Sequence, residues 1–361
     1  MSEKSNILIF TTSFGMGHLS VANAIKEQLI NENKENIIEI VDILDVSNPK
    51  TKDIFFNTYK FLTSKHENIY NYFYKIKKDV PNNYIDGIMY NMYLKKVAKY
   101  IMHKNPDLII STFPMCSGFV SKAKAKYDLK IPLITSITDV VDSWEWIHSN
   151  TDMYFVPSKV VGEKLVGKGI DEKQIKVTGI PVKNEFLQYL KKENSKKQLL
   201  IMGGVMDKLG IDQVVLDKLD GLSNVKTVIV TGNNKVLYDK LSKNSDYKNI
   251  EILGYTTEIA KFMSESDVLV TKPGGATLFE AINKGLPMII KNSNVGQEEE
   301  NIKYIREKGI GILIEDSESI EDIIIDSLSN TSVLELLRLN ISNIKNEINP
   351  HLIGKYALEL I

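Results

Sequence analysis

The chain has 361 residues, an apolar share of 43%, a charged share of 25% and a formal net charge of −1. This length predicts two domains, and the composition is that of an ordinary globular protein, which argues against a disordered chain. The near-zero net charge argues against nucleic acid as a partner. Cys116 is the only cysteine, which excludes an intrachain disulfide and a cysteine-based zinc site. Because no stretch resembles a signal peptide or a membrane-spanning helix, the expected location is cytoplasmic.

The first half of the chain alternates short apolar runs with helical stretches. A strand at 6–10 and a helix from Leu19 flank a glycine-containing turn. The further strands predicted in this half lie at 37–44, 106–112, 131–139 and 152–158. Such alternation is typical of a parallel sheet covered by helices.

The same pattern restarts at 197–210 with a strand that runs into glycines. The strands predicted to follow lie at 225–234, 250–255, 266–275 and 286–292. The predicted class is α/β, with two doubly wound domains facing each other across a cleft: an N-terminal domain over 1–183, a polar linker over 184–197 and a C-terminal domain over 198–345. Residues 346–361 read as a short amphipathic helix. In doubly wound sheets ligands bind beyond the carboxyl ends of the strands, where these glycine turns fall.

His18 follows Gly15 and Gly17 at the first of these turns. Glycines allow a sharp strand-to-helix turn, which would project the imidazole beyond the sheet. Histidine has a pKa suited to removing a proton from an attacking hydroxyl. The alternative is a histidine that only caps or packs the helix. Asp139 ends a predicted strand in the same domain and could orient His18 or the acceptor, or could cap a turn.

A second turn, "TKPGGATLFEA", places Gly274 and Gly275 at a predicted helix start, followed by Thr277 and Glu280. Backbone N–H groups at a helix N-terminus bind anions such as a pyrophosphate, and Lys272 could add a positive charge. The glycines could equally serve only a tight turn. One turn further along the chain, Gln297 and Glu298 offer an amide and a carboxylate to sugar hydroxyls.

Residues 51–104 carry ten lysines against four acidic residues, together with twelve aromatic residues. Basic and aromatic side chains interleaved on helices suit the headgroup layer of an anionic membrane. The alternatives are inward packing of the aromatic residues with solvated lysines, and single-stranded nucleic acid, which nothing else in the sequence supports.

The motifs "SFGMGH", "TGIP", "TKPGGATLFEA" and "VGQEEEN", in this order, resemble the monogalactosyldiacylglycerol synthase and processive diacylglycerol glucosyltransferase family. The resemblance runs from Ile7 to about Tyr304. It implies a GT-B fold and an inverting transfer of a hexose from a UDP-sugar to a lipid hydroxyl, most simply that of diacylglycerol. It also implies a peripheral location on the inner face of the cell membrane, and no metal or other cofactor.

The resemblance places the donor in the C-terminal domain and the lipid acceptor, with His18 as the base, in the N-terminal domain. The donor contacts that it implies are Gly203, Gly204 and residues 273–277 for the pyrophosphate, Gly254 and Tyr255 for the uracil, Glu280 for the ribose, Gln297 and Glu298 for the hexose, and the loop of Asn233 and Asn234. It also implies that the last helix packs back on the N-terminal domain.

One acceptor-side segment departs from the family. The family continues the Thr-Asp pair with a histidine, which here falls near Ser143, although Trp146 and His148 line up. Asp142 or Trp144 are the candidates to replace the missing histidine. The departure leaves room for a second reading, a protein that binds a sugar nucleotide as a sensor. A third reading is a UDP-sugar 2-epimerase of the same fold. The oligomeric state is left open.

Overall fold

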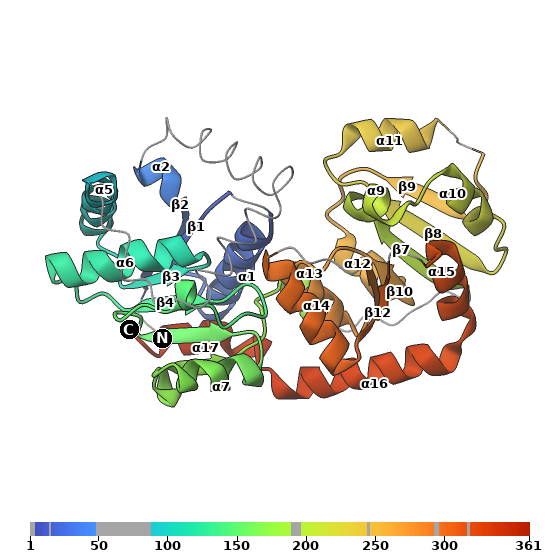
Figure 1. Ribbon diagram of the computed structural model, residues 1–361. Helices are drawn as coiled ribbons and strands as arrows, with labels where there is room; N and C mark the ends of the chain where they lie inside the picture. Colours follow the sequence, from blue (N-terminus) through green and yellow to red (C-terminus); the bar gives the residue numbers. More distant parts are fainter. Residues whose placement is uncertain are drawn as a thin grey trace. The chain divides into compact units, whose positions relative to one another are not determined.

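The computed structural model describes residues 4–13, 16–47, 88–188, 196–243, 246–291, 296–315 and 318–361. The chain forms two compact units. Unit 1 consists of Met1–Asn184, Val295–Glu300 and Glu347–Ile361, and unit 2 of Glu185–Asn294 and Asn301–Asn346. Each unit contains one six-stranded sheet with helices packed against it (Figure 1).

The sheet of unit 1 is parallel throughout, with the strand order β2-β1-β3-β4-β5-β6. Its strands are β1 (Asn6–Thr11), β2 (Ile37–Asp42), β3 (Leu108–Ser111), β4 (Leu133–Ser136), β5 (Met153–Val156) and β6 (Ile175–Val177). The helices among them are α1 (Met16–Glu32), α2 (Ile43–Ser47), α5 (Ile88–Lys104), α6 (Pro114–Tyr127), η2 (Trp144–Trp146), α7 (Lys159–Gly167) and η3 (Glu172–Gln174).

Both faces of this sheet are covered, as the continuous apolar strands require. Leu8 and Phe10 of β1 pack with buried residues of α5 and α6. Ile7 and Ile9 point to the opposite face and are also fully buried. Each such side chain contributes about 1.5–3 kcal/mol through its burial.

The sheet of unit 2 is also parallel, with the order β12-β11-β10-β7-β8-β9. Its strands are β7 (Lys197–Met202), β8 (Val225–Val230), β9 (Ile250–Leu253), β10 (Val268–Val270), β11 (Met288–Lys291) and β12 (Gly311–Ile314). The helices after β7 are η4 (Gly203–Val205), α9 (Met206–Leu209), α10 (Gln213–Asp220), α11 (Lys235–Ser242), α12 (Ile259–Glu265), α13 (Gly275–Lys284), α14 (Gly296–Lys308), α15 (Ile320–Ser329) and α16 (Thr331–Glu347).

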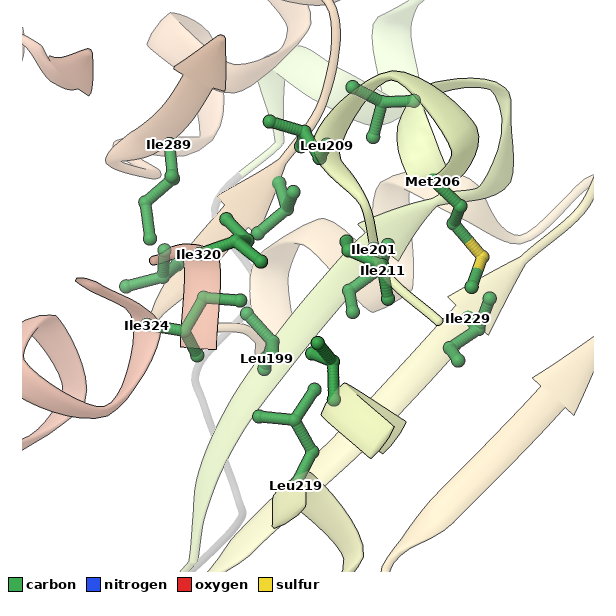
Figure 2. Packing of buried hydrophobic residues seen from close by; sticks show 14 of the residues in the cluster. Leu199, Ile201, Met206, Leu209, Ile211, Leu219, Ile229, Ile289, Ile320 and Ile324 are labelled. Atoms are coloured by element: carbon green, nitrogen blue, oxygen red, sulfur yellow. The ribbon is translucent and has the colours of Figure 1, made fainter. Parts of the chain in front are cut away.

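The core of unit 2 lies on one face of this sheet. Leu199 and Ile201 of β7 pack there with Leu219 of α10 and with Ile320 and Ile324 of α15 (Figure 2). Leu200, which lies between them in β7, points to the other face and is also fully buried. The sheet therefore has helices on both of its faces, as a doubly wound sheet requires.

Each sheet has one topological switch point. From β1 the chain first builds β2 on one side and then returns to build β3 on the other side. In unit 2 the chain runs from β7 through β8 to β9 and then returns to place β10 on the opposite side of β7. Ligands of open parallel sheets bind outside the carboxyl ends of the strands at such points. The segments after β1, β3, β7 and β10 are therefore the places to examine for a site.

The last residues of the chain belong to unit 1. After η5 (Pro350–Leu352), α17 (Ile353–Leu358) packs on α1. The contact is close, because a Cβ on Gly354 would lie 2.9 Å from the carbonyl oxygen of Gln28 and 2.7 Å from Cγ of Glu32. The absence of a side chain at Gly354 allows the two helices to approach each other.

Two predicted segments differ in detail from the structure. Helix α1 begins at Met16 rather than at Leu19. In the segment read as a linker, residues 184–187 form helix α8 (Asn184–Leu187) with Phe186 buried, and β7 already begins at Lys197. Most of the basic and aromatic segment, residues 51–87, lies outside the described residues. None of the helices that the structure describes is both long and apolar enough to cross a membrane.

Candidate active site

His18 lies in the first turn of α1, beside the switch point between β1 and β3. Its Nδ1 is 3.1 Å from the carbonyl oxygen of Thr112, the residue that follows β3, and 2.9 Å from Oγ1 of Thr138, beyond the end of β4. The ring of Phe113 meets the imidazole edge-on, with 4.8 Å between centroids. Loops from two neighbouring strands thus fix the half-buried ring.

The hydrogen bond to the carbonyl of Thr112 determines which nitrogen of His18 carries the proton in the neutral ring. A backbone carbonyl only accepts, so the bond to Thr112 requires a proton on Nδ1. Among the described residues, Nε2 has no hydrogen-bond partner. Burial lowers the pKa of His18 to about 4, against a smaller upward contribution from the Thr112 carbonyl. At neutral pH the side chain is therefore an uncharged base whose lone pair lies on Nε2.

This lowered pKa makes a prediction for the pH dependence of activity. If His18 must be neutral to act, kcat/KM should stay level as the pH falls from 7 to about 5 and should decline only towards pH 4, whereas an ordinary histidine would titrate near 6.5. Initial rates measured across pH 4–8 test this. An acidic limb centred near 6.5 would contradict it.

Protein stability provides the control for that experiment. His148 also has a pKa lowered to about 4 by burial, and the pKa of both histidines returns to about 6.5 in the unfolded chain. Between these values the unfolded chain binds more protons, so the free energy of unfolding falls as the pH drops from 6.5 to 4. Circular dichroism at each pH separates unfolding from titration of a folded site.

Asp139 follows Thr138 and is largely buried. Its carbonyl oxygen accepts a hydrogen bond from the backbone N–H of Val141 at 2.8 Å. The atoms that orient Nδ1 of His18 are those of Thr112 and Thr138. The direct contact to the ring therefore comes from the residue before Asp139, and sequence reasoning missed it. The only sequence signal for this contact was a hydroxyl residue, Thr138, near the end of a predicted strand.

The segment that departs from the family is engaged within unit 1. Asp142 forms ion pairs with Lys168 at 2.8 Å and Lys164 at 3.5 Å. The Lys168 ammonium also lies 5.4 Å from the centroid of the Trp144 ring. Ser143, which stands near the expected histidine, is fully buried and caps η2 by accepting the N–H of Glu145 at 3.4 Å. Asp142 and Ser143 thus have structural partners of their own.

The aligned residues of that segment are also packed. Trp146 is buried, and Nε2 of His148 lies 3.2 Å from the carbonyl oxygen of Pro114. A Cβ on Gly118 would lie 3.1 Å from the His148 ring, so glycine leaves room for it on α6. Of the two glycines before His18, Gly17 is exposed within the first turn of α1, and Gly15 lies outside the described residues.

In unit 2, Gly203 and Gly204 lie directly after β7 and have different surroundings. A Cβ on Gly203 would lie only 2.8 Å from Cα of Thr231 and 3.1 Å from the carbonyl oxygen of Val230. Real Cβ atoms essentially never approach another atom as closely as 2.8 Å, and 3.1 Å is tighter than nine in ten real Cβ contacts. A Cβ on Gly204 would meet nothing within 4 Å. Gly203 is therefore required for packing against the end of β8, whereas Gly204 borders open space.

On the other side of the same switch point, β10 leads to the N-terminus of α13. Gly274 occupies the N-cap position without a side-chain cap, and Gly275 is the first helical residue. The first N–H groups of a helix have no intrahelical partner and attract anions. Lys272 is exposed, and Thr277 and Glu280 are half-buried.

The loop before α13 is held by a residue that sequence reasoning missed. The side-chain amide of Asn301 on α14 is fully buried and donates to the carbonyl oxygen of Pro273 at 2.9 Å. A lone asparagine inside a predicted helix gave no signal for this role.

The other residues expected on the donor side follow β8, β9 and β11. Asn233 is exposed, while Asn234 caps α11 by accepting the N–H of Leu237 at 3.0 Å. Gly254 lies against the ring of Tyr238, and Tyr255 is 69% exposed. Gln297 and Glu298 lie in the first turn of α14, where Glu298 is half-buried and the side chain of Gln297 is outside the described set.

Comparisons with known proteins found matches over both halves of the chain. Residues 18–182 match the monogalactosyldiacylglycerol (MGDG) synthase family, and residues 198–345 match the glycosyltransferase family 28 C-terminal domain. The chain is 30% identical over 379 residues to a processive diacylglycerol beta-glucosyltransferase of Staphylococcus epidermidis, covering 100% of this chain and 94% of the relative. The Bacillus subtilis protein of the same name is 29% identical, with 95% and 92% covered.

Solved structures share the fold at low sequence identity. The MurG of Acinetobacter baumannii has a TM-score of 0.63 at 14% identity, with 99% of both chains covered. The UDP-GlcNAc 2-epimerase of Neisseria meningitidis bound to UDP-GlcNAc has a TM-score of 0.58 at 15% identity, with 98% of this chain and 99% of the other covered. These likenesses confirm the predicted pair of doubly wound domains of the GT-B type.

Proposed function

Because the chain belongs to the family of the processive diacylglycerol glucosyltransferases and is a hexosyltransferase, we propose that it moves a hexose from a UDP-sugar to diacylglycerol with inversion at the anomeric carbon. The observation that carries the proposal is the hydrogen bonding of Nδ1 of His18 to protein oxygens, which leaves Nε2 without a partner among the described residues. The proposed reaction is a direct displacement at the sugar.

In this displacement the lipid hydroxyl attacks the anomeric carbon and its proton passes to Nε2 of His18. A bond forms between the hydroxyl oxygen and the anomeric carbon. The bond from that carbon to the UDP oxygen breaks, and the electron pair leaves with UDP. Nδ1 keeps its proton, so the imidazolium that forms donates to Thr112 throughout. Proton transfer of this kind contributes about 10²–10⁴-fold to a rate.

We assign donor binding to the switch point of unit 2. The N-terminus of α13, with Gly274 and Gly275, would receive the diphosphate, and the exposed Lys272 would add a positive charge to the departing UDP. Glu280, one turn into α13, would accept hydrogen bonds from ribose hydroxyls. Gly204, which has no neighbour in its side-chain direction, would let the diphosphate approach the backbone.

We assign the membrane-facing surface to α5, the described part of the basic segment. On its exposed side Met92 and Met102, each 47% exposed, flank the exposed Lys95, Lys96 and Lys99. Apolar side chains can enter the headgroup layer while the lysines contact anionic lipid. Each lysine near such a surface contributes about 1 kcal/mol.

The double variant Lys95→Gln/Lys99→Gln should therefore lose about 2 kcal/mol of membrane affinity, roughly 30-fold in the partition coefficient, on vesicles rich in phosphatidylglycerol. Vesicle sedimentation at 50 and 300 mM salt measures this, and the difference should shrink at high salt. Lys235→Gln/Lys240→Gln on α11 removes the same charge elsewhere and serves as the matched control. Equal partitioning of the two double variants would contradict the assignment to α5.

The experiment that tests the proposed function presents UDP-glucose, UDP-galactose or UDP-N-acetylglucosamine to the purified protein, with and without diacylglycerol in anionic vesicles. UDP release and glycolipid formation are measured together. The proposal expects UDP release that depends on diacylglycerol and matches the glycolipid formed. Release of UDP without lipid, or epimerised donor, would favour the epimerase. Binding of UDP-sugar with neither product would favour a sensor.

A further inference from the structure

Among the described residues, the polar contacts of the His18 ring converge on one nitrogen. Nδ1 faces the carbonyl oxygen of Thr112 at 3.1 Å and the hydroxyl of Thr138 at 2.9 Å. Neither partner carries a charge. The common arrangement for a catalytic histidine, in which a carboxylate receives the Nδ1 proton, is here replaced by a carbonyl and a hydroxyl.

The carbonyl of Thr112 needs a proton on Nδ1. The hydroxyl of Thr138 is compatible with that tautomer only if it accepts the hydrogen bond from Nδ1. The hydroxyl could donate to Nδ1 only if that nitrogen were unprotonated, and the carbonyl of Thr112 would then face a lone pair. Among the described residues, His18 is the only hydrogen-bond donor to this carbonyl, and Thr112 is fully buried. Since a buried carbonyl without a donor is costly, Nδ1 carries the proton and both oxygens accept from it.

We propose that Thr138 is a positioning residue for the transfer reaction, whose hydroxyl accepts from Nδ1–H of His18, holds Nε2 toward the acceptor and stabilises the imidazolium formed in the reaction. The proposal rests on His18 being the base of the proposed function. Thr112 supplies the same contact through its backbone, which substitution cannot remove. Thr138 therefore provides the contact to Nδ1 of His18 that a substitution can remove.

The hydroxyl acts more strongly on the charged ring than on the neutral one. Hydrogen bonds become shorter and stronger when the donor is charged. Charge develops on His18 only as the lipid hydroxyl loses its proton. The contact from Thr138 is thus stronger in the transition state than in the ground state, which raises kcat rather than substrate affinity.

One backbone hydrogen bond ties the loop that carries Thr138 to β5, and another closes a turn within the loop. The N–H of Ile137 donates to the carbonyl oxygen of Phe155 on β5 at 3.0 Å, and Val141 N–H donates to the carbonyl oxygen of Asp139 at 2.8 Å. Thr138 itself is 4% exposed. A hydroxyl held this way keeps its place without help from substrate.

Three ionisable groups of the described residues lie at or near the strand ends around His18. Asp42, at the end of β2, accepts from Ser13 N–H and Oγ at 3.1 and 2.8 Å. Cys116 on α6 is buried, which raises the pKa of its thiol, and Asp139 follows Thr138. A pH effect of Thr138 must therefore be measured with these three groups unchanged, which a threonine substitution achieves.

The first test needs no activity. Protein with ¹⁵N in the histidine rings is titrated by NMR, and the His18 signal is assigned by its loss in His18→Gln. We expect the wild-type ring to be neutral and protonated on Nδ1 at pH 7. In Thr138→Val the pKa of His18 should fall below the wild-type value because one acceptor is lost, and Thr138→Ser should restore it. Protonation on Nε2 in the wild type, or an unchanged pKa in Thr138→Val, would overturn the proposal.

The second test measures transfer with the same variants. Thr138→Val should lower kcat by about 10- to 100-fold, the size of a hydrogen bond to a charged group, with KM for the donor unchanged, and Thr138→Ser should recover most of the rate. The matched control is Thr135→Val on β4. Its hydroxyl is also buried but bonds Ser117 and Thr151 at 3.0 and 3.3 Å, so its pH profile should match the wild type.

The two tests separate the proposal from the function on which it rests. If the wild-type protein transfers no sugar but the titration behaves as expected, the proposed function fails and the hydrogen bond stands. If transfer occurs and Thr138→Val loses stability and rate to the same extent as Thr135→Val, with no change in the titration of His18, Thr138 is only structural and the proposal fails.

Discussion

His18→Gln should lower the rate of glycolipid formation by about 10²–10⁴-fold, the usual contribution of a general base. Glutamine keeps a polar side chain at the first turn of α1 but has no nitrogen that can accept the proton of the lipid hydroxyl. The residues assigned to the donor belong to other segments, so binding of UDP should stay within about twofold of the wild type. Initial rates and calorimetric titration with UDP measure the two effects.

The control for this substitution is His351→Gln. His351 is exposed on η5 and has no assigned role, so its variant should transfer sugar at the wild-type rate. A His18→Gln protein that is folded, binds UDP and retains more than about a tenth of the wild-type rate would show that another group takes the proton.

Gly203→Ala should destabilise unit 2 by about 3 kcal/mol. The added Cβ would lie 2.8 Å from Cα of Thr231, a backbone atom that cannot rotate away, so β7 and the end of β8 must separate. Thermal and urea unfolding measure the loss of stability. The loss should be read from the unfolding transition of unit 2, because the two units need not unfold together.

Gly204→Ala is the matched control one residue away. Nothing lies within 4 Å of its Cβ, so the stability should change by less than about 0.5 kcal/mol. If the diphosphate approaches this backbone as proposed, the added methyl group should instead weaken UDP binding. Equal stability of the two variants would show that β7 and β8 adjust freely, and unchanged UDP binding by Gly204→Ala would remove Gly204 from the donor site.

The central strands of both sheets could be predicted from the sequence because they are buried on two faces and appear as continuous apolar runs. The strands β6 and β12, which the prediction missed, are edge strands with one neighbour each, as are β2 and β9, which it found. Residues of β6 are only half-buried, and β12 begins at a glycine. Whether these segments form strands depends on pairing with a neighbouring strand, which cannot be predicted from the local sequence.

The candidate site was predictable to the extent that it depends on local sequence. The glycine-histidine turn pointed to His18 because the chain must turn out of the sheet there. The contact from Thr138 depends on β4 lying beside β3 in the sheet, which only the fold determines. In the same way, the two glycines after β7 look alike in sequence, and only the position of Thr231 distinguishes a packing residue from one that borders open space.

The docking of α17 on α1 has a consequence for synthesis of the protein. Helix α1, which carries His18, is synthesised before unit 2, whereas its partner α17, which carries Gly354, is synthesised after it. Until then the face of α1 around Gln28 lacks its covering helix, while all of unit 2 has already been made. Unit 1 therefore completes its fold only after unit 2 has been synthesised, and truncation before Ile353 would leave this face of α1 uncovered.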